Sequence, residues 1–144
     1  MKYAKDKKGF TLVEMLVVIA IIAVLVAIII PTVMSATTKA KAATDAANLR
    51  SVLGQANNAA LLGHGIESAK NADIEVPPCK SYPSAKMQLL FVYPGFIDVY
   101  YVDGDNYYTL DYFSDLAENG KTEISAAAPS TADYDNAEWY TFGE

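Results

Sequence analysis

The sequence predicts an α+β protein in which one long N-terminal helix packs on a small antiparallel sheet of three or four strands. Three observations indicate this class: an apolar segment of membrane length near the N-terminus, a helical spacing of apolar residues beyond it, and a C-terminal part rich in aromatic and β-branched residues. The chain has 144 residues, which is enough for one small domain and an appendage.

The apolar segment covers residues 10–30 and contains a single charged side chain, Glu14. As an α-helix it would be about 31 Å long, which matches a hydrocarbon layer of about 30 Å. Four lysines lie within the first nine residues. The positive-inside rule therefore predicts a cytoplasmic N-terminus, with Pro31 and the following residues on the other side of the membrane. An ordinary secretory signal has a shorter apolar stretch, of about 7–15 residues.

Beyond Pro31 the sequence keeps a helical period until a Gly-His-Gly sequence at residues 63–65, which is typical of a helix end. We therefore expect one helix over residues 10–62, about 80 Å long. Pro31 lacks an N–H donor and is expected to kink or loosen it. Asp45 is expected to lie off the apolar stripe. The many alanines favour packing of this stripe on a sheet over a coiled coil. The stripe consists of Ala42, Ala46, Leu49, Leu53, Ala56 and Ala60.

The C-terminal part is expected to form the sheet. Residues 66–86 are interpreted as a loop because three prolines exclude regular structure there. Residues 114–137 are expected to be irregular. The turn sequence Asp-Gly-Asp-Asn at 103–106 predicts that the second and third strands form a hairpin. The strands are expected at 87–93, 96–102 and 107–113, with a short final strand at 138–142.

The charge of the chain argues against direct binding of one class of partner, nucleic acids. It has 11 basic and 17 acidic residues, of which four basic and one acidic lie in the first nine positions. The remainder carries seven basic and sixteen acidic residues. Such an acidic domain lacks the positive surface that binds phosphates, so no direct nucleic-acid partner is expected.

The residues that carry enzymatic chemistry are scarce. Cys79 is the only cysteine, so no disulfide can form within the chain. We interpret it as a small packing residue, with a bond between chains as the alternative. The sequence lacks a phosphate-binding glycine loop followed by lysine, a His/Cys metal spacing and a nucleophile–base signature. We therefore expect no enzymatic activity.

The junction before the apolar segment reads Lys-Lys-Gly-Phe-Thr-Leu-Val-Glu at residues 7–14. It resembles the prepilin signal of type IV pilins and type II secretion pseudopilins, and the resemblance covers residues 7–31. In that family a membrane peptidase cuts after the glycine and methylates the new N-terminal residue. The resemblance implies cleavage between Gly9 and Phe10, N-methylation of Phe10, and the pilin fold. It divides the chain into a leader (1–9), a transmembrane and assembly half of the helix (10–30), an amphipathic half (31–62) and a globular β domain (63–144).

Glu14 needs a partner, because a carboxylate at the centre of a membrane costs about 2.5–3.5 kcal/mol. One interpretation is that its side chain only reaches the headgroups. The alternative uses the ammonium that cleavage creates at Phe10, since Phe10 and Glu14 are i and i+4 on one helix face. The resemblance implies that Glu14 pairs with the Phe10 amine of a neighbouring subunit in a filament and fixes axial register. Pro31 matches the family's proline, and residues 23–31 are predicted to unwind on assembly.

The resemblance implies a structural subunit of a type IV pilus that serves adhesion, motility or surface interaction. A pseudopilin of type II secretion is the alternative, and an anchored binding module that does not polymerise is the second. The implied partners are copies of the chain, related minor pilins, the prepilin peptidase and methyltransferase, the inner-membrane assembly platform and the lipid bilayer. The subunit would be a single-pass membrane protein before assembly and part of an extracellular filament afterwards.

A cation site is an alternative to the expectation that no cofactor is bound. Asp103, Asp105 and Asn106 offer clustered oxygen ligands, and Asp133 or Asp135 would add more. Major pseudopilins bind calcium in their C-terminal region. Because turns attract Asp and Asn for reasons of local hydrogen bonding, the same cluster also suits a plain hairpin turn.

Overall fold

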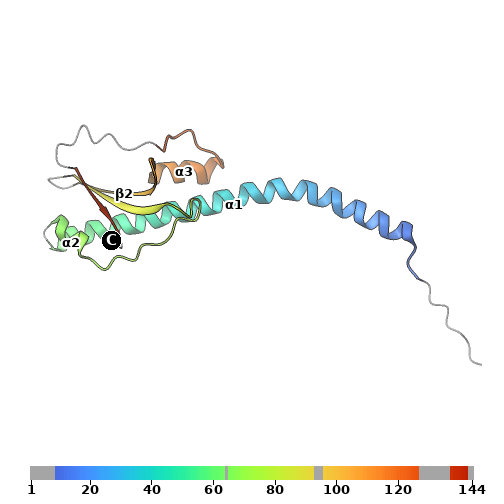
Figure 1. Ribbon diagram of the computed structural model, residues 1–144, viewed down its shortest axis with the longest axis horizontal. Helices are drawn as coiled ribbons and strands as arrows, with labels where there is room; N and C mark the ends of the chain where they lie inside the picture. The colour runs from blue at the N-terminus through green and yellow to red at the C-terminus, as the bar shows by residue number, and fades with distance from the viewer. Residues whose placement is uncertain (1–8, 64, 93–95, 127–136, 143–144) are drawn as a thin grey trace, which may run out of the picture. The chain divides into compact units, whose positions relative to one another are not determined.

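The computed structural model describes residues 9–63, 65–92, 96–126 and 137–142 (Figure 1). The chain divides into two compact units, Met1–Ser35 and Ala36–Glu144. Each unit is described by itself. The elements in chain order are α1 (Leu12–Gly63), α2 (Ile66–Lys70), β1 (Lys86–Val92), β2 (Phe96–Asp103), β3 (Asn106–Tyr108), α3 (Leu110–Asn119) and β4 (Ala137–Thr141).

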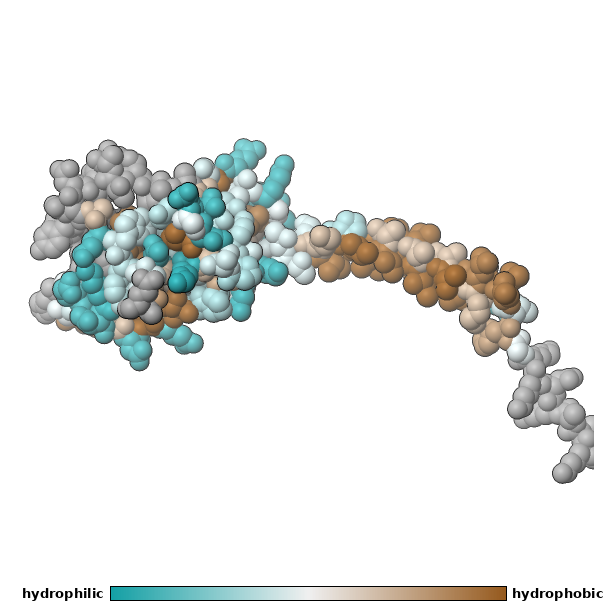
Figure 2. All heavy atoms as spheres, in the orientation of Figure 1, coloured by the Kyte–Doolittle hydropathy of each residue, from teal (hydrophilic) through white to brown (hydrophobic). Residues whose placement is uncertain are grey.

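The first unit contains the N-terminal part of α1. Every residue of α1 from Leu12 to Ser35 is exposed, and Figure 2 shows the apolar surface of this stretch. Among the described residues, α1 is the one helix long and apolar enough to cross a membrane by length and composition. Pro31 does not interrupt the helix, and the Thr32 hydroxyl donates to the Ile29 carbonyl at 2.7 Å. The predicted single helix is confirmed to within two residues at its start and one at its end.

The second unit contains the rest of α1, which buries one face. Ala42, Leu49, Val52 and Ala56 are at most 1% exposed. The predicted stripe is confirmed in its main members, but Leu53 is only half-buried and Val52 takes its place in the core. The expectation for Asp45 was wrong, because this carboxylate is fully buried on the same face as the apolar residues.

The sheet has four strands in the order β3-β2-β1-β4, and every neighbouring pair is antiparallel. At its centre Leu89 of β1 lies opposite Val99 of β2 and Tyr140 of β4. Met87 and Leu89 belong to the core shared with α1, whereas Leu90 joins a separate apolar cluster. This alternation is the period expected of strands. The α+β class is confirmed. Three of the four predicted strands are confirmed to within one or two residues at their ends. Tyr93, the last residue of the first predicted strand, lies outside the described residues.

The prediction of a strand over residues 107–113 was wrong after Tyr108. β3 has three residues, and α3 begins at Leu110. The hydroxyl of Thr109 accepts a hydrogen bond from the Tyr112 N–H at 3.0 Å and caps the new helix. Gly120 ends the helix with a left-handed conformation, φ 75°. The expected irregular stretch was therefore also wrong for residues 114–119.

The predicted loop over residues 66–86 was wrong at both ends, because α2 occupies Ile66–Lys70 and β1 already begins at Lys86. Lys70 joins this short helix to the sheet: its ammonium lies 3.2 Å from a Glu67 carboxylate oxygen and 2.8 Å from one of Glu138 in β4. Residues 71–85 form no helix or strand. This extended segment therefore connects α2 to the first strand along the edge of the domain.

An aromatic cluster closes the core around α3. Tyr82 stacks on Tyr108 with ring centroids 4.1 Å apart, and its hydroxyl lies 2.6 Å from that of Tyr112. Phe113 is fully buried and contacts Tyr101 edge to face. Of these rings, Tyr112 and Phe113 were predicted for a strand but belong to α3, where they pack against the rings of the sheet and of Tyr82.

Candidate functional site: the start of the apolar helix

The helix start places Gly9 and Phe10 outside regular structure. α1 begins at Leu12, and the Phe10 side chain is 81% exposed. A Cβ added to Gly9 would meet no atom within 4 Å, so packing within the chain does not require glycine there. The bond between the two residues therefore precedes the helix in an accessible part of the chain.

Thr11 and Glu14 form a reciprocal capping box at this helix start. A Glu14 carboxylate oxygen accepts from the Thr11 N–H at 2.7 Å and from the Thr11 hydroxyl at 2.9 Å. The Glu14 N–H in turn donates to the Thr11 hydroxyl oxygen at 3.2 Å. Such a box satisfies N–H groups that a helix start leaves without partners. Sequence reasoning missed Thr11, although the Thr-x-x-Glu pattern at residues 11–14 carries the signal.

The uncut chain therefore gives Glu14 a local partner instead of an ionic one. In this chain the nitrogen of Phe10 belongs to a peptide bond and carries no charge, so Glu14 binds the donors of Thr11. The carboxylate lies one turn into a helix whose other side chains up to Ser35 are uncharged. Pro31 lies farther along the same helix and does not meet Glu14. The arrangement holds one negative charge close to the predicted cleavage site.

The predicted calcium residues lie at the hairpin turn between β2 and β3. The Asp103 carboxylate accepts from the Ser84 hydroxyl at 2.5 Å, and the Asn106 amide donates to the Asp103 carbonyl at 3.4 Å. Gly104 supplies a positive φ of 60°. The described residues contain no group of three or more His, Cys, Asp or Glu side chains that could hold a metal. Asp133 and Asp135 lie outside the described residues. The described part of the turn is a hydrogen-bonded hairpin, and a calcium site, which needs six to eight oxygen ligands, stays a prediction.

Cys79 lies in the core beside Asp45. The Asp45 carboxylate accepts from the Lys80 N–H at 2.6 Å, from the Ser81 N–H at 2.8 Å and from the Cys79 thiol at 3.4 Å. Burial raises the pKa of the Cys79 thiol to about 12. The thiol is 2% exposed, which fits the packing interpretation and leaves it poorly placed for a bond between chains. Sequence reasoning missed the role of Asp45, whose spacing from Ala42 and Leu49 placed it on the buried face.

These features define a class of protein: a precursor with an accessible peptide bond directly before an apolar helix of membrane length, whose continuation packs on an antiparallel sheet. Residues 4–30 match the prokaryotic N-terminal methylation motif, which is the prepilin signal of type IV pilins and pseudopilins. The chain carries this signal, which implies processing by prepilin peptidase. Neither a curated protein nor a solved structure matches the chain.

Proposed function

We propose that the chain is a pilin, the structural subunit of a type IV pilus that serves adhesion, motility or surface interaction. One observation carries the proposal: the single charge in the apolar segment, Glu14, lies directly after the prepilin cleavage sequence. The role is structural and needs no catalytic residue. The first part of α1 stores the subunit in the membrane with its N-terminus in the cytoplasm, and the assembled filament is extracellular.

Processing changes the charge at the helix start. Prepilin peptidase hydrolyses the bond between Gly9 and Phe10, so that water adds to the glycine carbonyl and the nitrogen of Phe10 becomes an amine. The methyltransferase then adds a methyl group to this amine, which remains able to carry a positive charge. The new ammonium lies at the positive end of the helix dipole, where a nearby carboxylate stabilises it.

Assembly then exchanges the partner of Glu14. In the stored subunit its carboxylate is satisfied by the capping box with Thr11. In the filament it pairs with the Phe10 ammonium of a neighbouring copy. Two unit charges about 4 Å apart gain about 4 kcal/mol at an effective dielectric constant of 20, which offsets the cost of burying the carboxylate. Any other axial register leaves a charge without a partner, so Glu14 fixes the register.

The exposed apolar surface of residues 12–35 supports the same proposal, because it needs lipid before assembly and other copies afterwards. Residues 23–31 unwind on assembly, since they are rich in β-branched residues and end at Pro31. Minor pilins and the inner-membrane assembly platform are the further partners. Calcium at Asp103, Asp105 and Asn106 is not needed in this proposal.

A pseudopilin is the second candidate, because the methylation motif is common to both classes. The single cysteine favours a pseudopilin, because a chain with one cysteine cannot form the internal disulfide that closes the C-terminal region of many pilins. The experiment that tests the proposal is electron microscopy of shear fractions from cells with and without the gene, with the filament protein identified by its peptides. A pilin gives long surface filaments that contain this chain. A chain that stays in the membrane fraction and forms no filament overturns the proposal.

A further inference from the structure

The charges of the second unit are divided unevenly between α1 and the rest of the chain. Residues 36–63, all in α1, carry one acidic side chain, Asp45, which is buried. The same residues carry three basic side chains, those of Lys39, Lys41 and Arg50. From residue 64 onward the chain carries four basic and fourteen acidic side chains. The surface of this part of α1 is therefore positive, whereas the rest of the domain is strongly negative.

Arg50 is the one arginine of the chain, and its side chain is exposed. Both ion pairs among the described residues belong to Lys70, so Arg50 has no carboxylate partner among them. A guanidinium presents a planar set of donors that matches the two oxygens of a carboxylate. Arg50 thus offers an unpaired cation that suits an acidic side chain of another molecule.

α3 carries an acidic row formed by Asp111, Asp115 and Glu118, which follow one another at i, i+4 and i+7. This helix contains no basic residue. Glu118 is exposed and lies in the last turn, where the helix dipole disfavours a carboxylate. The Lys39 ammonium donates to the main-chain carbonyl of Glu118 at 2.7 Å and forms no ion pair with its carboxylate. A cation from outside the copy would therefore stabilise this end of the acidic row.

Arg50 and Glu118 of the same copy lie far apart along α1. Lys39, which contacts the Glu118 carbonyl, precedes Arg50 by eleven residues. This separation is about 16 Å and close to three full turns, so Lys39 and Arg50 lie on the same side of the helix. A second copy displaced along the helix axis by about this distance brings its Glu118 level with Arg50 of the first copy.

We propose that Arg50 of one copy pairs with Glu118, in the acidic row of α3, of a neighbouring copy. A positive and a negative surface on different parts of one molecule make a head-to-tail contact, which can repeat along a filament. After cleavage each copy carries seven basic and sixteen acidic residues, so contact between like surfaces is repulsive and contact between unlike surfaces is selected. The proposal rests on the polymerisation proposed above and concerns the folded domains, away from Glu14.

Reversal of the two charges in the full chain tests this contact through the filament yield in shear fractions. Arg50→Glu and Glu118→Arg are each expected to lower the yield by about tenfold or more, because each places two like charges in contact. The two changes combined in one chain restore opposite charges, and the yield should return to within about threefold of the unmodified chain. Cleavage after Gly9 and the amount of membrane-stored chain should stay the same in all variants.

Two controls distinguish a specific pair from a change in net charge. Lys41→Glu makes the same change in charge as Arg50→Glu. Lys41 precedes Arg50 by nine residues, or about two and a half turns, and so lies on the other side of α1. This control should lower the yield by less than about threefold. The second control combines Arg50→Glu with Asp73→Arg, which restores the net charge at an exposed carboxylate outside α3 and should not restore the yield.

The outcomes separate this contact from the polymer itself. The pairing is overturned, and the pilin proposal stands, if Arg50→Glu leaves the yield unchanged or if the reversed pair fails to recover filaments. It is also overturned if Lys41→Glu lowers the yield as much as Arg50→Glu, or if Asp73→Arg rescues as well as Glu118→Arg, because net charge then explains the effect. Absence of filaments from the unmodified chain overturns both proposals.

Discussion

The two parts of α1 bury their apolar residues in different ways. From Leu12 to Ser35 every residue is exposed and apolar residues lie on all sides, whereas from Ala36 to Gly63 one face is buried by the sheet. Apolar residues on all sides of a helix indicate lipid or a helical bundle, and a single apolar face indicates one partner. The first part of the helix therefore suits apolar surroundings on every side, and the second part suits packing on one face. The spacing of the apolar residues makes this difference between the two parts.

The charges in the two parts show the same contrast. Glu14, in the apolar part, is satisfied by Thr11 through hydrogen bonds that an ionic partner can replace. Asp45, in the buried face, holds three donors from a segment far away in sequence and has no exposed surface. The Glu14 carboxylate can therefore exchange its hydrogen bonds for a new partner, whereas the Asp45 carboxylate keeps its partners for as long as the chain is folded.

Replacement of Glu14 is expected to have the largest effect on assembly. Glu14→Ala leaves the Phe10 ammonium of the neighbouring copy in the filament without its partner, and an unpaired buried charge is strongly unfavourable, so filament yield should fall by well over tenfold. Cleavage after Gly9 and membrane insertion should persist. Filaments in shear fractions and the size of the membrane-stored chain measure the two effects. Glu14→Asp, which keeps the charge on a shorter side chain, is the matched control, and normal yield from Glu14→Ala would remove the role of this residue.

Replacement of Asp45 tests the other carboxylate. Asp45→Ala leaves the partly buried N–H groups of Lys80 and Ser81 without the acceptor that the buried carboxylate supplies, so the free energy of unfolding should fall by about 2 kcal/mol. Urea unfolding of the full chain in detergent, followed by circular dichroism, measures this. The exposed carboxylate in Asp73→Ala is the control and should change the free energy by less than about 0.5 kcal/mol. Equal effects of the two changes would contradict the role of Asp45 as a clamp.

A smaller effect is expected at the start of α3. Thr109→Ala removes the acceptor for the Tyr112 N–H and should lower the free energy of unfolding by about 1 kcal/mol. Thr109→Ser keeps an acceptor oxygen and should stay within a few tenths of a kcal/mol of the original chain. The same urea titration compares them. If the alanine variant matches the serine variant, the hydroxyl does not stabilise this helix.

The smallest effect concerns pH. Burial raises the pKa of the Cys79 thiol from 9.0 to about 12, so the folded chain keeps a proton that the unfolded chain releases. This contribution to stability is complete below about pH 9 and is lost as the pH rises from there toward 12. Alkylation by iodoacetamide should accordingly be slow in the folded chain at pH 8 and fast in urea. Rapid alkylation of the folded chain at that pH would contradict the burial of this thiol.

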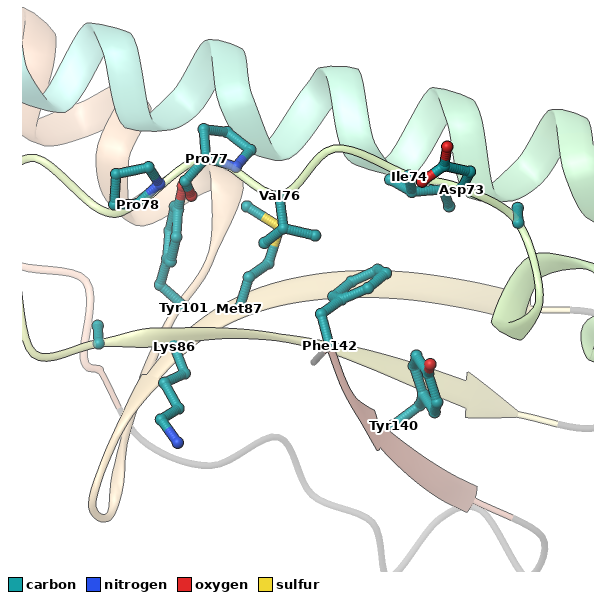
Figure 3. A pocket seen from close by; sticks show the side chains of 12 residues that line it. Asp73, Ile74, Val76, Pro77, Pro78, Lys86, Met87, Tyr101, Tyr140 and Phe142 are labelled. Atoms are coloured by element: carbon teal, nitrogen blue, oxygen red, sulfur yellow. The ribbon is translucent and has the colours of Figure 1, made fainter. Parts of the chain in front are cut away.

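Sequence periodicity was sufficient for the elements that depend on local spacing. It predicted α1, the stripe around Leu49 and three of the four strands. It failed at residues 109–113, because the aromatic residues there suit a strand, while the cap at Thr109 and the close fit of Phe113 in the core favour a helix. It also placed Asp45 in solvent, since a carboxylate is rarely buried and its donors come from a distant segment. The groove between the segment of residues 72–78 and the ends of β1 and β4 (Figure 3) depends on segments brought together only by folding, so no local pattern indicated it.

The central claim is that a cut before Phe10 creates the positive charge that Glu14 meets on another copy. Intact mass spectrometry of the chain recovered from filaments or membranes tests it most directly. The account predicts a polypeptide that begins at Phe10 and carries one added methyl group on its N-terminal nitrogen. A mature chain that still begins at Met1, with no methyl group, would contradict it.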